Sequence, residues 1–301
     1  MSPKDLPEEP EVVPPAEVIE EKSEADTIVS DVAHLNPNES VLLKDEDAEA
    51  QIRRMSRRSF LWAAIAAGAT FGGLRWMNTR RLDDGIVWPL RRALDATGEI
   101  SQDFFSTARL APQYPRLRAR TPRENGDYGL GEDFDVAAWT LSVSGLASGE
   151  DLELTLADIK KLPKLEMTTE LKCIEGWATI VNWGGVRLLD FMKKYPPNTI
   201  SGNSPDFGNN LADLLPYVSL VTPDGAYYVG LDMASALHPQ TMLCYEMNGK
   251  PLTLAHGAPL RLVTPVKYGI KYIKRLGQIT YTALRPADFW AEQGYDWYAG
   301  H

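Results

Sequence analysis

The sequence predicts a mixed α+β, strand-rich body that is preceded by a disordered tail and one membrane anchor helix. Three observations lead to this prediction: short stretches of alternating apolar and polar residues in the second half, a long apolar run near residue 65, and an amino-terminal part that is poor in aromatic residues. The chain has 301 residues, of which 44% are hydrophobic, so it can bury a sizeable core. Four segments are expected, at residues 1–52, 53–78, 79–123 and 124–301.

The first segment, residues 1–52, is strongly acidic. Its first 50 residues contain fifteen Asp and Glu and three Lys. They are rich in Glu and Pro and cannot bury enough apolar surface to offset the entropy of ordering, so we expect a disordered tail. Since the whole chain has a net charge of −10, the remainder is close to neutral. A body without a surplus of basic residues is not expected to bind nucleic acid.

Residues 53–78 carry a targeting signal in the string Ser56-Arg57-Arg58-Ser59-Phe60-Leu61, which resembles a twin-arginine export signal. The apolar run that follows, residues 60–77, would span roughly 27 Å as a helix, close to the thickness of the hydrocarbon layer. No Ala-x-Ala motif follows the run, so we expect an uncleaved single-pass anchor of the bacterial inner membrane. The resemblance to a twin-arginine signal places the body on the periplasmic side. A removed signal peptide and a buried core helix are the alternatives.

Residues 79–123 are expected to form a neck with one amphipathic helix near residues 90–94. The folded body follows from residue 124 onward. Alternation and β-branched content predict strands at residues 139–143, 169–174, 217–222, 241–247 and 260–264. Capping residues and apolar spacing predict short helices at residues 155–159, 188–192 and 232–237. Turn signals lie at residues 223–225 and 248–249.

Two cysteines, Cys173 and Cys244, lie 71 residues apart, without the close spacing of zinc or iron–sulfur sites. Cys173 ends a predicted strand and precedes a glycine-containing turn, a place where a rigid scaffold presents reactive groups. Its thiolate could bind a soft or high-valent metal or act as a nucleophile with His256, but a lone cysteine is also a common buried hydrophobe. A disulfide with Cys244 is a further alternative that the sequence leaves open.

Residues 256–275 form a basic segment that combines Gly and Pro turns with five cations, Arg261, Lys267, Lys271, Lys274 and Arg275. Cations within an otherwise apolar stretch suit an anionic ligand that carries a phosphate. A solvated strand with alternating lysines would give the same pattern. The spacing alone does not decide between these two interpretations.

Several motifs in a fixed order resemble the molybdopterin domain of the sulfite oxidase family. They are Cys173-Ile174-Glu175-Gly176-Trp177, Trp183-x-Gly185-Val186, Tyr245-Glu246-Met247-Asn248-Gly249, the string from His256 to Val263, and Tyr268-Gly269-x-Lys271-x-x-Lys274. The resemblance covers residues 123–301 and is nearest to the bacterial protein-methionine-sulfoxide reductase branch. It implies a mixed α+β fold that buries a molybdenum-molybdopterin (Mo-pyranopterin) cofactor.

The resemblance also implies roles for single residues. Cys173 would be the protein ligand of the metal and a catalytic residue, and Arg261 and Lys274 would hold the cofactor phosphate. The full set of implied cofactor contacts is Asn125, Tyr128, Gly129, Cys173, Thr222, His256, Arg261, Tyr272, Ile273 and Lys274.

One departure from the family pattern concerns the substrate. Sulfite-oxidising members follow the cysteine with an Ala-Gly-Asn-Arg-type string, whereas this chain has Ile174-Glu175-Gly176-Trp177. A carboxylate at Glu175 would repel sulfite, which favours reduction of an uncharged sulfoxide or N-oxide, small or protein-bound. Glu175 is expected to be a catalytic proton donor, with a structural carboxylate as the alternative.

The resemblance further implies a monomeric body that receives electrons from a membrane donor such as a heme b protein. Two other functions stay open at this point. One is a sulfite-oxidising member of the family, and the other is an anchored binding module that has kept the fold and lost the redox chemistry.

Overall fold

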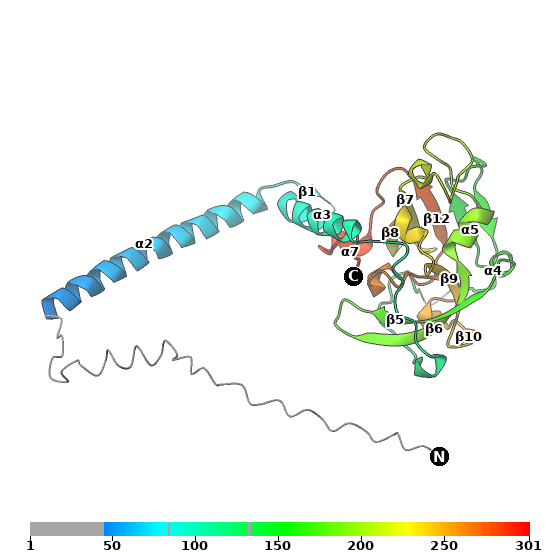
Figure 1. Cartoon of the computed structure of the whole chain (residues 1–301), viewed down its shortest axis with the longest axis horizontal. Coiled ribbons are helices and arrows are strands. Elements are labelled where there is room, and N and C mark those ends of the chain that lie inside the picture. Colours follow the sequence, from blue (N-terminus) through cyan, green and yellow to red (C-terminus); the bar gives the residue numbers. More distant parts are fainter. Residues whose placement is uncertain (1–44, 84, 132–133) are drawn as a thin grey trace, which may run out of the picture. The chain divides into compact units, whose positions relative to one another are not determined.

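Figure 1 shows a computed structural model of the chain. The structure describes residues 45–83, 85–131 and 134–301. Residues 1–44 of the tail expected at residues 1–52 lie outside the described residues. The chain divides into two compact units after Gly72, and each unit is described by itself.

Helix α2 (Asp45–Asn78) contains the whole of the expected signal and anchor segment. Large apolar side chains along it, including Phe60, Trp62 and Phe71, are exposed. In the part of the chain that the structure describes, no helix is both long enough and apolar enough to cross a membrane. The expected membrane anchor is therefore not confirmed.

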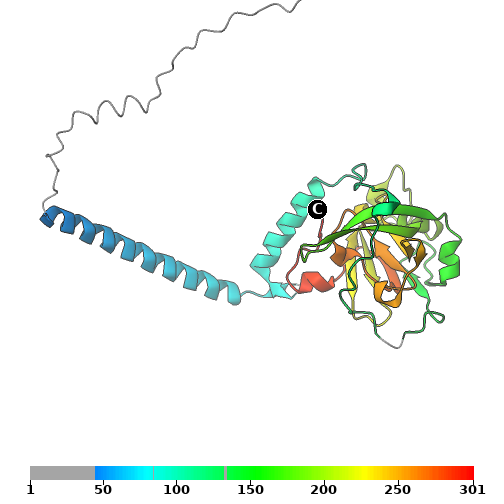
Figure 2. The same ribbon diagram turned by 90° about the horizontal axis from the view of Figure 1, so that it is seen from below.

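The second unit begins with the neck, a β-hairpin followed by helix α3. Strands β1 (Leu82–Asp83) and β2 (Ile86–Val87) pair antiparallel. Helix α3 (Trp88–Asp103) has a proline in its first turn, where a backbone N–H would have no partner within the helix, so the proline costs no hydrogen bond. The helix expected near residues 90–94 is confirmed. In both views, α3 lies beside the carboxyl-terminal helix α7 (Phe289–Glu292), so the neck packs on the end of the chain (Figures 1 and 2).

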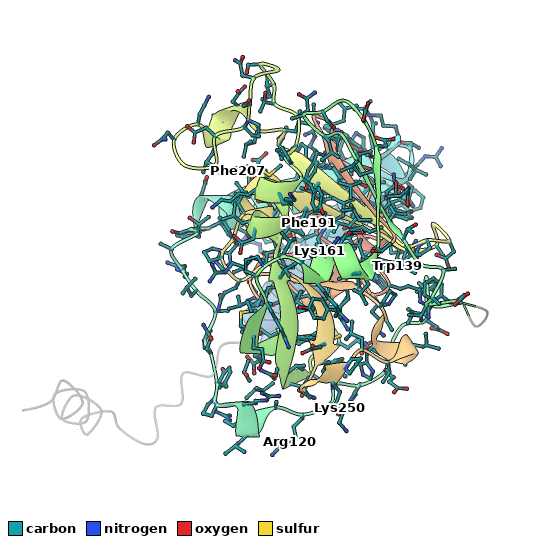
Figure 3. All side chains as sticks on the ribbon, turned by 90° about the vertical axis from the view of Figure 1, so that its right-hand side faces the viewer. Arg120, Trp139, Lys161, Phe191, Phe207 and Lys250 are labelled. Atoms are coloured by element: carbon teal, nitrogen blue, oxygen red, sulfur yellow. The ribbon has the colours of Figure 1, made fainter. Side chains whose placement is uncertain are left out.

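A first five-stranded sheet has the order β4–β3–β12–β7–β8, and its neighbours pair antiparallel except for β3 and β12. Its strands are β3 (Leu141–Ser144), β4 (Leu152–Leu154), β7 (Tyr217–Val221), β8 (Tyr228–Asp232) and β12 (Gln278–Thr282). Apolar side chains of this sheet pack with α5 (Leu188–Lys194) into the larger core cluster, which includes Trp139 and Phe191 (Figure 3). Removal of this apolar surface from water is the main force that holds the unit together.

A second sheet has the order β10–β9–β6–β5, with β11 paired to β9 as well. Its strands are β5 (Leu165–Lys172), β6 (Ala178–Arg187), β9 (Met242–Met247), β10 (Lys250–Pro251) and β11 (Arg261–Val263). The hairpin β5–β6 is connected by residues 173–177, which carry Cys173. A second core cluster around Met167, Trp183 and Met242 lies on this sheet.

Short helical turns join the strands. They are α4 (Leu156–Lys160), α6 (Met233–Ala236), η1 (Arg116–Arg118), η2 (Leu211–Asp213), η3 (Leu254–His256) and η4 (Gly269–Lys271). Thr155 caps α4 by accepting from the Asp158 N–H, and Asp232 caps α6 in the same way.

The mixed α+β body is confirmed. Each of the five expected strands and three expected helices of the body is found, with bounds shifted by a few residues, and both expected turns follow strands. Cys173 lies directly after β5 rather than inside it. Strands β4, β6, β8, β10 and β12 of the body were not expected.

Candidate active site

A cavity of about 330 Å³ lies where the β5–β6 connection meets the segment 122–128, the region 256–274 and the carboxyl-terminal residues. Eight residues that the sequence singled out line it: Asn125, Tyr128, Cys173, Glu175, His256, Arg261, Tyr272 and Lys274. Segments far apart in the sequence thus bring a thiol, a carboxylate and two cations to one cavity.

The Cys173 side chain is presented by a tight turn. The Cys173 N–H donates to the carbonyl oxygen of Trp177 (2.9 Å), and the Gly176 N–H donates back to the carbonyl oxygen of Cys173 (3.1 Å). Gly176 has φ 84°, a left-handed conformation that favours glycine and lets the chain reverse here. Burial raises the pKa of the Cys173 thiol, so at neutral pH it is protonated unless a cation binds the sulfur.

Glu175 lies beside the thiol and is held by two donors. The indole N–H of Trp177 donates to its Oε2 (2.9 Å), and the amide Nδ2 of Asn125 lies 3.5 Å from the same oxygen. That Nδ2 is also 3.9 Å from the Cys173 sulfur. Asn125 therefore connects the sulfur to an exposed carboxylate, which can exchange protons with solvent.

Arg261 brings a buried positive charge to the cavity. Its guanidinium donates to the carbonyl oxygens of His256 (3.0 Å) and Tyr272 (3.1 Å), while its Nε has no hydrogen-bond partner. Among the described residues no carboxylate lies within 4.0 Å of it. Burial lowers the pKa of Arg261 to about 10, which still leaves the group charged at neutral pH. The hydroxyl of Tyr272, also buried, is likewise without a partner.

Lys274 adds a second cation. Its ammonium donates to the carbonyl oxygens of Asn125 (2.7 Å) and Gly126 (3.2 Å), which ties the segment 122–128 to the basic segment. Burial, and to a lesser extent the charge of Arg261, lowers the pKa of Lys274 to about 8. Two cations in one cavity, together with an unpartnered Nε and an unpartnered hydroxyl, form a site that fits a phosphate group.

His256 lines the cavity, but its ring nitrogens contact groups other than Cys173. Its Nδ1 lies 2.8 Å from the Thr253 hydroxyl, and its Nε2 lies 3.3 Å from the carbonyl oxygen of Pro122. Both ring nitrogens are therefore used, and a Cys173–His256 dyad is not formed. Both cysteines are free, and Cys244 is fully buried in β9, so the alternative of a disulfide is wrong for this structure.

Three of the residues singled out from the sequence do not line the cavity: Gly129, Thr222 and Ile273. Gly129 has φ 72°, and a Cβ there would lie 2.4 Å from a methyl group of Thr222, so the two pack in contact. The Thr222 hydroxyl donates to Asp224 (2.6 Å). Ile273 is in the larger core cluster, between the two lining residues Tyr272 and Lys274.

The sequence did not single out several residues that the structure places on the wall, among them Tyr227, Ile270, Trp290 and Tyr295. The Tyr227 hydroxyl donates to the carbonyl oxygen of Ile270 (2.6 Å), and burial raises the pKa of Tyr227. The signal that could have found Trp290 and Tyr295 is the density of aromatic residues in 289–298.

Comparison with known proteins identifies the family. Residues 129–290 match the model of the oxidoreductase molybdopterin binding domain, which is more than half of the chain. A protein from Azospira oryzae with the provisional name protein-methionine-sulfoxide reductase subunit YedZ1 is 32% identical over 266 residues, which cover 86% of this chain and 94% of that protein.

The protein-methionine-sulfoxide reductase catalytic subunit MsrP from Campylobacter jejuni is 32% identical over 205 residues, which cover 64% of this chain and 67% of the relative. Among solved structures, the sulfane dehydrogenase SoxCD from Paracoccus pantotrophus aligns with a TM-score of 0.42 and 17% identity, over 51% of this chain and 40% of that one. This last likeness is too low to carry an argument. The family match and the two relatives show that the chain belongs to the oxidoreductase molybdopterin-binding family, the sulfite oxidase type, and is a molybdopterin-dependent oxidoreductase.

Proposed function

We propose that the chain reduces an uncharged sulfoxide, such as a methionine sulfoxide residue, with Cys173 as the protein ligand of molybdenum. In this proposal Arg261 and Lys274 hold the phosphate of the cofactor, and Asn125, Tyr128, His256 and Tyr272 contact the rest of it. Gly129, Thr222 and Ile273 support these contacts. The observation that carries the proposal is a free thiol and two cations without a carboxylate partner on the wall of one cavity.

The chemistry of each group determines its proposed role in the reaction. When bound, the cofactor supplies the two-electron oxygen-atom transfer. A metal cation at the Cys173 sulfur would release the proton that the buried thiol otherwise keeps. Conversion of a sulfoxide to a thioether and water consumes two electrons and two protons. Glu175, exposed and held by Trp177 and Asn125, can pass protons from solvent to the reacting oxygen through its Oε2.

Two observations favour a sulfoxide over sulfite. The relatives from Azospira oryzae and Campylobacter jejuni are named for protein-methionine-sulfoxide reduction. In addition, the Glu175 carboxylate lies close to the thiol, and a negative charge there disfavours an anionic substrate.

The experiment is an assay of the molybdenum-loaded protein with a sulfoxide, an N-oxide and sulfite, using a dye as electron source or acceptor. We expect sulfoxide reduction to be the fastest reaction. In Glu175→Gln, kcat/KM for sulfite should rise by about tenfold, since the substitution removes one repulsive charge. Faster turnover of sulfite than of any sulfoxide by the unmodified protein would refute the proposal.

We further propose that the twin-arginine string exports the folded protein and that a membrane electron donor, such as a heme b protein, reduces it on the extracytoplasmic side. Arg57 and Arg58 are exposed on α2, as a recognition signal requires. Cell fractionation of Arg57→Lys/Arg58→Lys should find the protein retained in the cytoplasm, whereas Arg80→Lys/Arg81→Lys should leave its location unchanged. Normal export of the first variant would disprove the signal.

The electron donor is tested in isolated membranes. Addition of the enzyme together with a sulfoxide should reoxidise the reduced heme of the membranes. If the heme stays reduced, the proposal of a heme b protein as electron donor is wrong.

A further inference from the structure

The last residues of the chain form one wall of the cavity. We call residues 286–301 the carboxyl-terminal strap. Trp290, in α7, and Tyr295 line the cavity, with ring centroids 5.3 Å apart and ring planes at 85°. The two rings therefore meet edge to face and form an aromatic corner.

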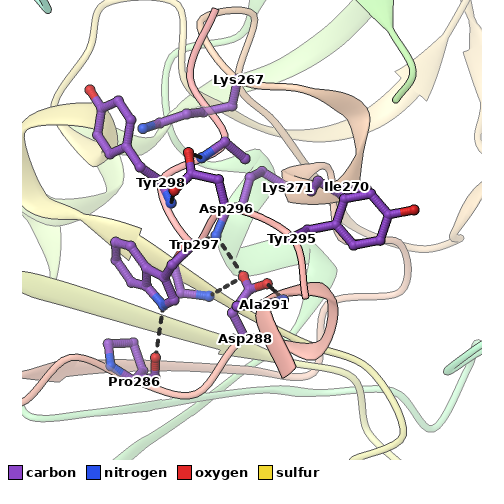
Figure 4. Close-up of polar contacts among 12 residues, drawn as sticks. Lys267, Ile270, Lys271, Pro286, Asp288, Ala291, Tyr295, Asp296, Trp297 and Tyr298 are labelled. Carbon is purple, nitrogen blue, oxygen red and sulfur yellow. Dashed lines mark hydrogen bonds and ion pairs between the residues drawn. The ribbon is translucent and has the colours of Figure 1, made fainter. Parts of the chain in front are cut away.

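Buried polar contacts fix the beginning of the strap (Figure 4). Asp288 is 3% exposed and accepts from the Lys271 ammonium (2.6 Å) and from the Gly230 N–H (3.1 Å). Its other oxygen accepts from the Ala291 N–H (3.1 Å) and so caps α7. A single carboxylate thus sets the orientation of the helical turn that carries Trp290.

Further contacts hold the rest of the strap. The Trp297 indole donates to the carbonyl oxygen of Pro286 (2.9 Å), as Figure 4 shows. Arg91 of α3 donates to the carbonyl oxygens of Ala291 (2.5 Å) and Tyr295 (3.4 Å). The aromatic corner is therefore fixed by the neck on one side and by the body on the other.

The lining of the cavity combines two kinds of side chain. Arg261 and Lys274 contribute positive charge, whereas the strap contributes only the uncharged aromatic side chains of Trp290 and Tyr295. Tyr227, whose ring centroid lies 5.3 Å from that of Phe289, and Ile270 extend the aromatic wall beyond the strap. A Cβ on the adjacent Gly269 would lie 3.9 Å from the Cα of Cys173, so this wall lies near the residue that carries the sulfur. Aromatic rings pack favourably against the methyl group of a methyl sulfoxide and against the thioether sulfur of the product.

We propose that Trp290 and Tyr295 are the residues that determine substrate specificity, and that they bind the methyl sulfoxide end of a methionine sulfoxide residue within a peptide. This inference rests on the proposed function. The charged residues of the lining are Arg123, Glu175, Arg261 and Lys274, and none belongs to the strap. A peptide suits this wall better than the free amino acid does, because its amide groups replace the charged ammonium and carboxylate that would need partners.

The test measures kcat and KM of the molybdenum-loaded full chain for an N-acetylated, C-amidated peptide that contains one methionine sulfoxide. Trp290→Leu and Tyr295→Leu should each raise KM by about tenfold while kcat changes by less than about threefold. Trp290→Phe and Tyr295→Phe, which keep a ring, should stay close to the unmodified protein. The matched control is Tyr114→Leu, an aromatic residue of the neck that does not line the cavity. It should leave KM unchanged.

Each outcome bears on the inference in a defined way. An unchanged KM in both leucine variants overturns it and leaves the proposed function intact. Loss of bound molybdenum in the leucine variants also overturns the inference, because Trp290 and Tyr295 would then maintain the cofactor site and not bind the substrate. An unmodified protein that reduces no sulfoxide overturns the proposed function, and the inference with it.

Discussion

Replacement of Cys173 by serine is expected to lower kcat for sulfoxide reduction by at least about 1000-fold, more than the roughly 10- to 100-fold that loss of an outer-sphere contact costs. The physical reason is the loss of the soft thiolate, for which a serine hydroxyl, hard and far less acidic, is a poor substitute. The fold should persist, because Cys173 lies in a connection after β5 and contributes little to either core cluster. Turnover with a reduced dye, together with circular dichroism, measures both effects.

The second cysteine provides the matched control. Cys244 lies in β9 with no exposed surface, so Cys244→Ala should cost some stability through a small cavity and leave kcat unchanged. An active Cys173→Ser variant, or an inactive but folded Cys244→Ala variant, would show that the reactive sulfur has been assigned to the wrong residue.

Replacement of Arg261 by methionine is expected to weaken cofactor binding by roughly 10- to 100-fold, because a hydrogen bond to a charged group contributes about 1.5–3 kcal/mol. The methionine side chain fills most of the space but provides no donor for the phosphate. The loss of the Arg261 charge should have a large effect, because Arg261 is buried and its Nε has no hydrogen-bond partner among the described residues. Pterin retained after repeated gel filtration, and quantified after release, gives the measurement.

Arg187→Met is the control for this substitution. Arg187 is exposed at the end of β6 and does not line the cavity, so the variant should retain the cofactor as the unmodified protein does. Equal pterin retention in Arg261→Met and Arg187→Met would exclude Arg261 from the phosphate site.

Local sequence signals predicted most of the body. Thr155 and Asp232 cap helices, and residues 223–225 and 248–249 form turns, because in these cases neighbouring residues determine the conformation. Strand β6 was missed because its second half is buried on both faces and contains Gly184 and Gly185, so it neither alternates nor looks like a strand. Its conformation depends on pairing with β5, the other strand of its hairpin, and with β9, which is distant in the sequence.

The cofactor side of the cavity could be predicted because its residues fall in contiguous motifs, such as 173–177 and 256–274. The strap side could not. Trp290 and Tyr295 are held at the wall by contacts that involve Asp288, Lys271 and Arg91, which come from three separate parts of the chain. The membrane anchor was expected from the length of the apolar run, and among the described residues no helix has both the length and the apolar character to confirm it.

The central claim is that the sulfur of Cys173 binds molybdenum. X-ray absorption at the molybdenum edge, on the unmodified protein and on Cys173→Ser loaded in the same host, tests it most directly. We expect the serine variant to have one sulfur fewer in the first coordination sphere of the metal and an additional oxygen or nitrogen in its place. The same number of sulfur neighbours in both proteins would contradict the account.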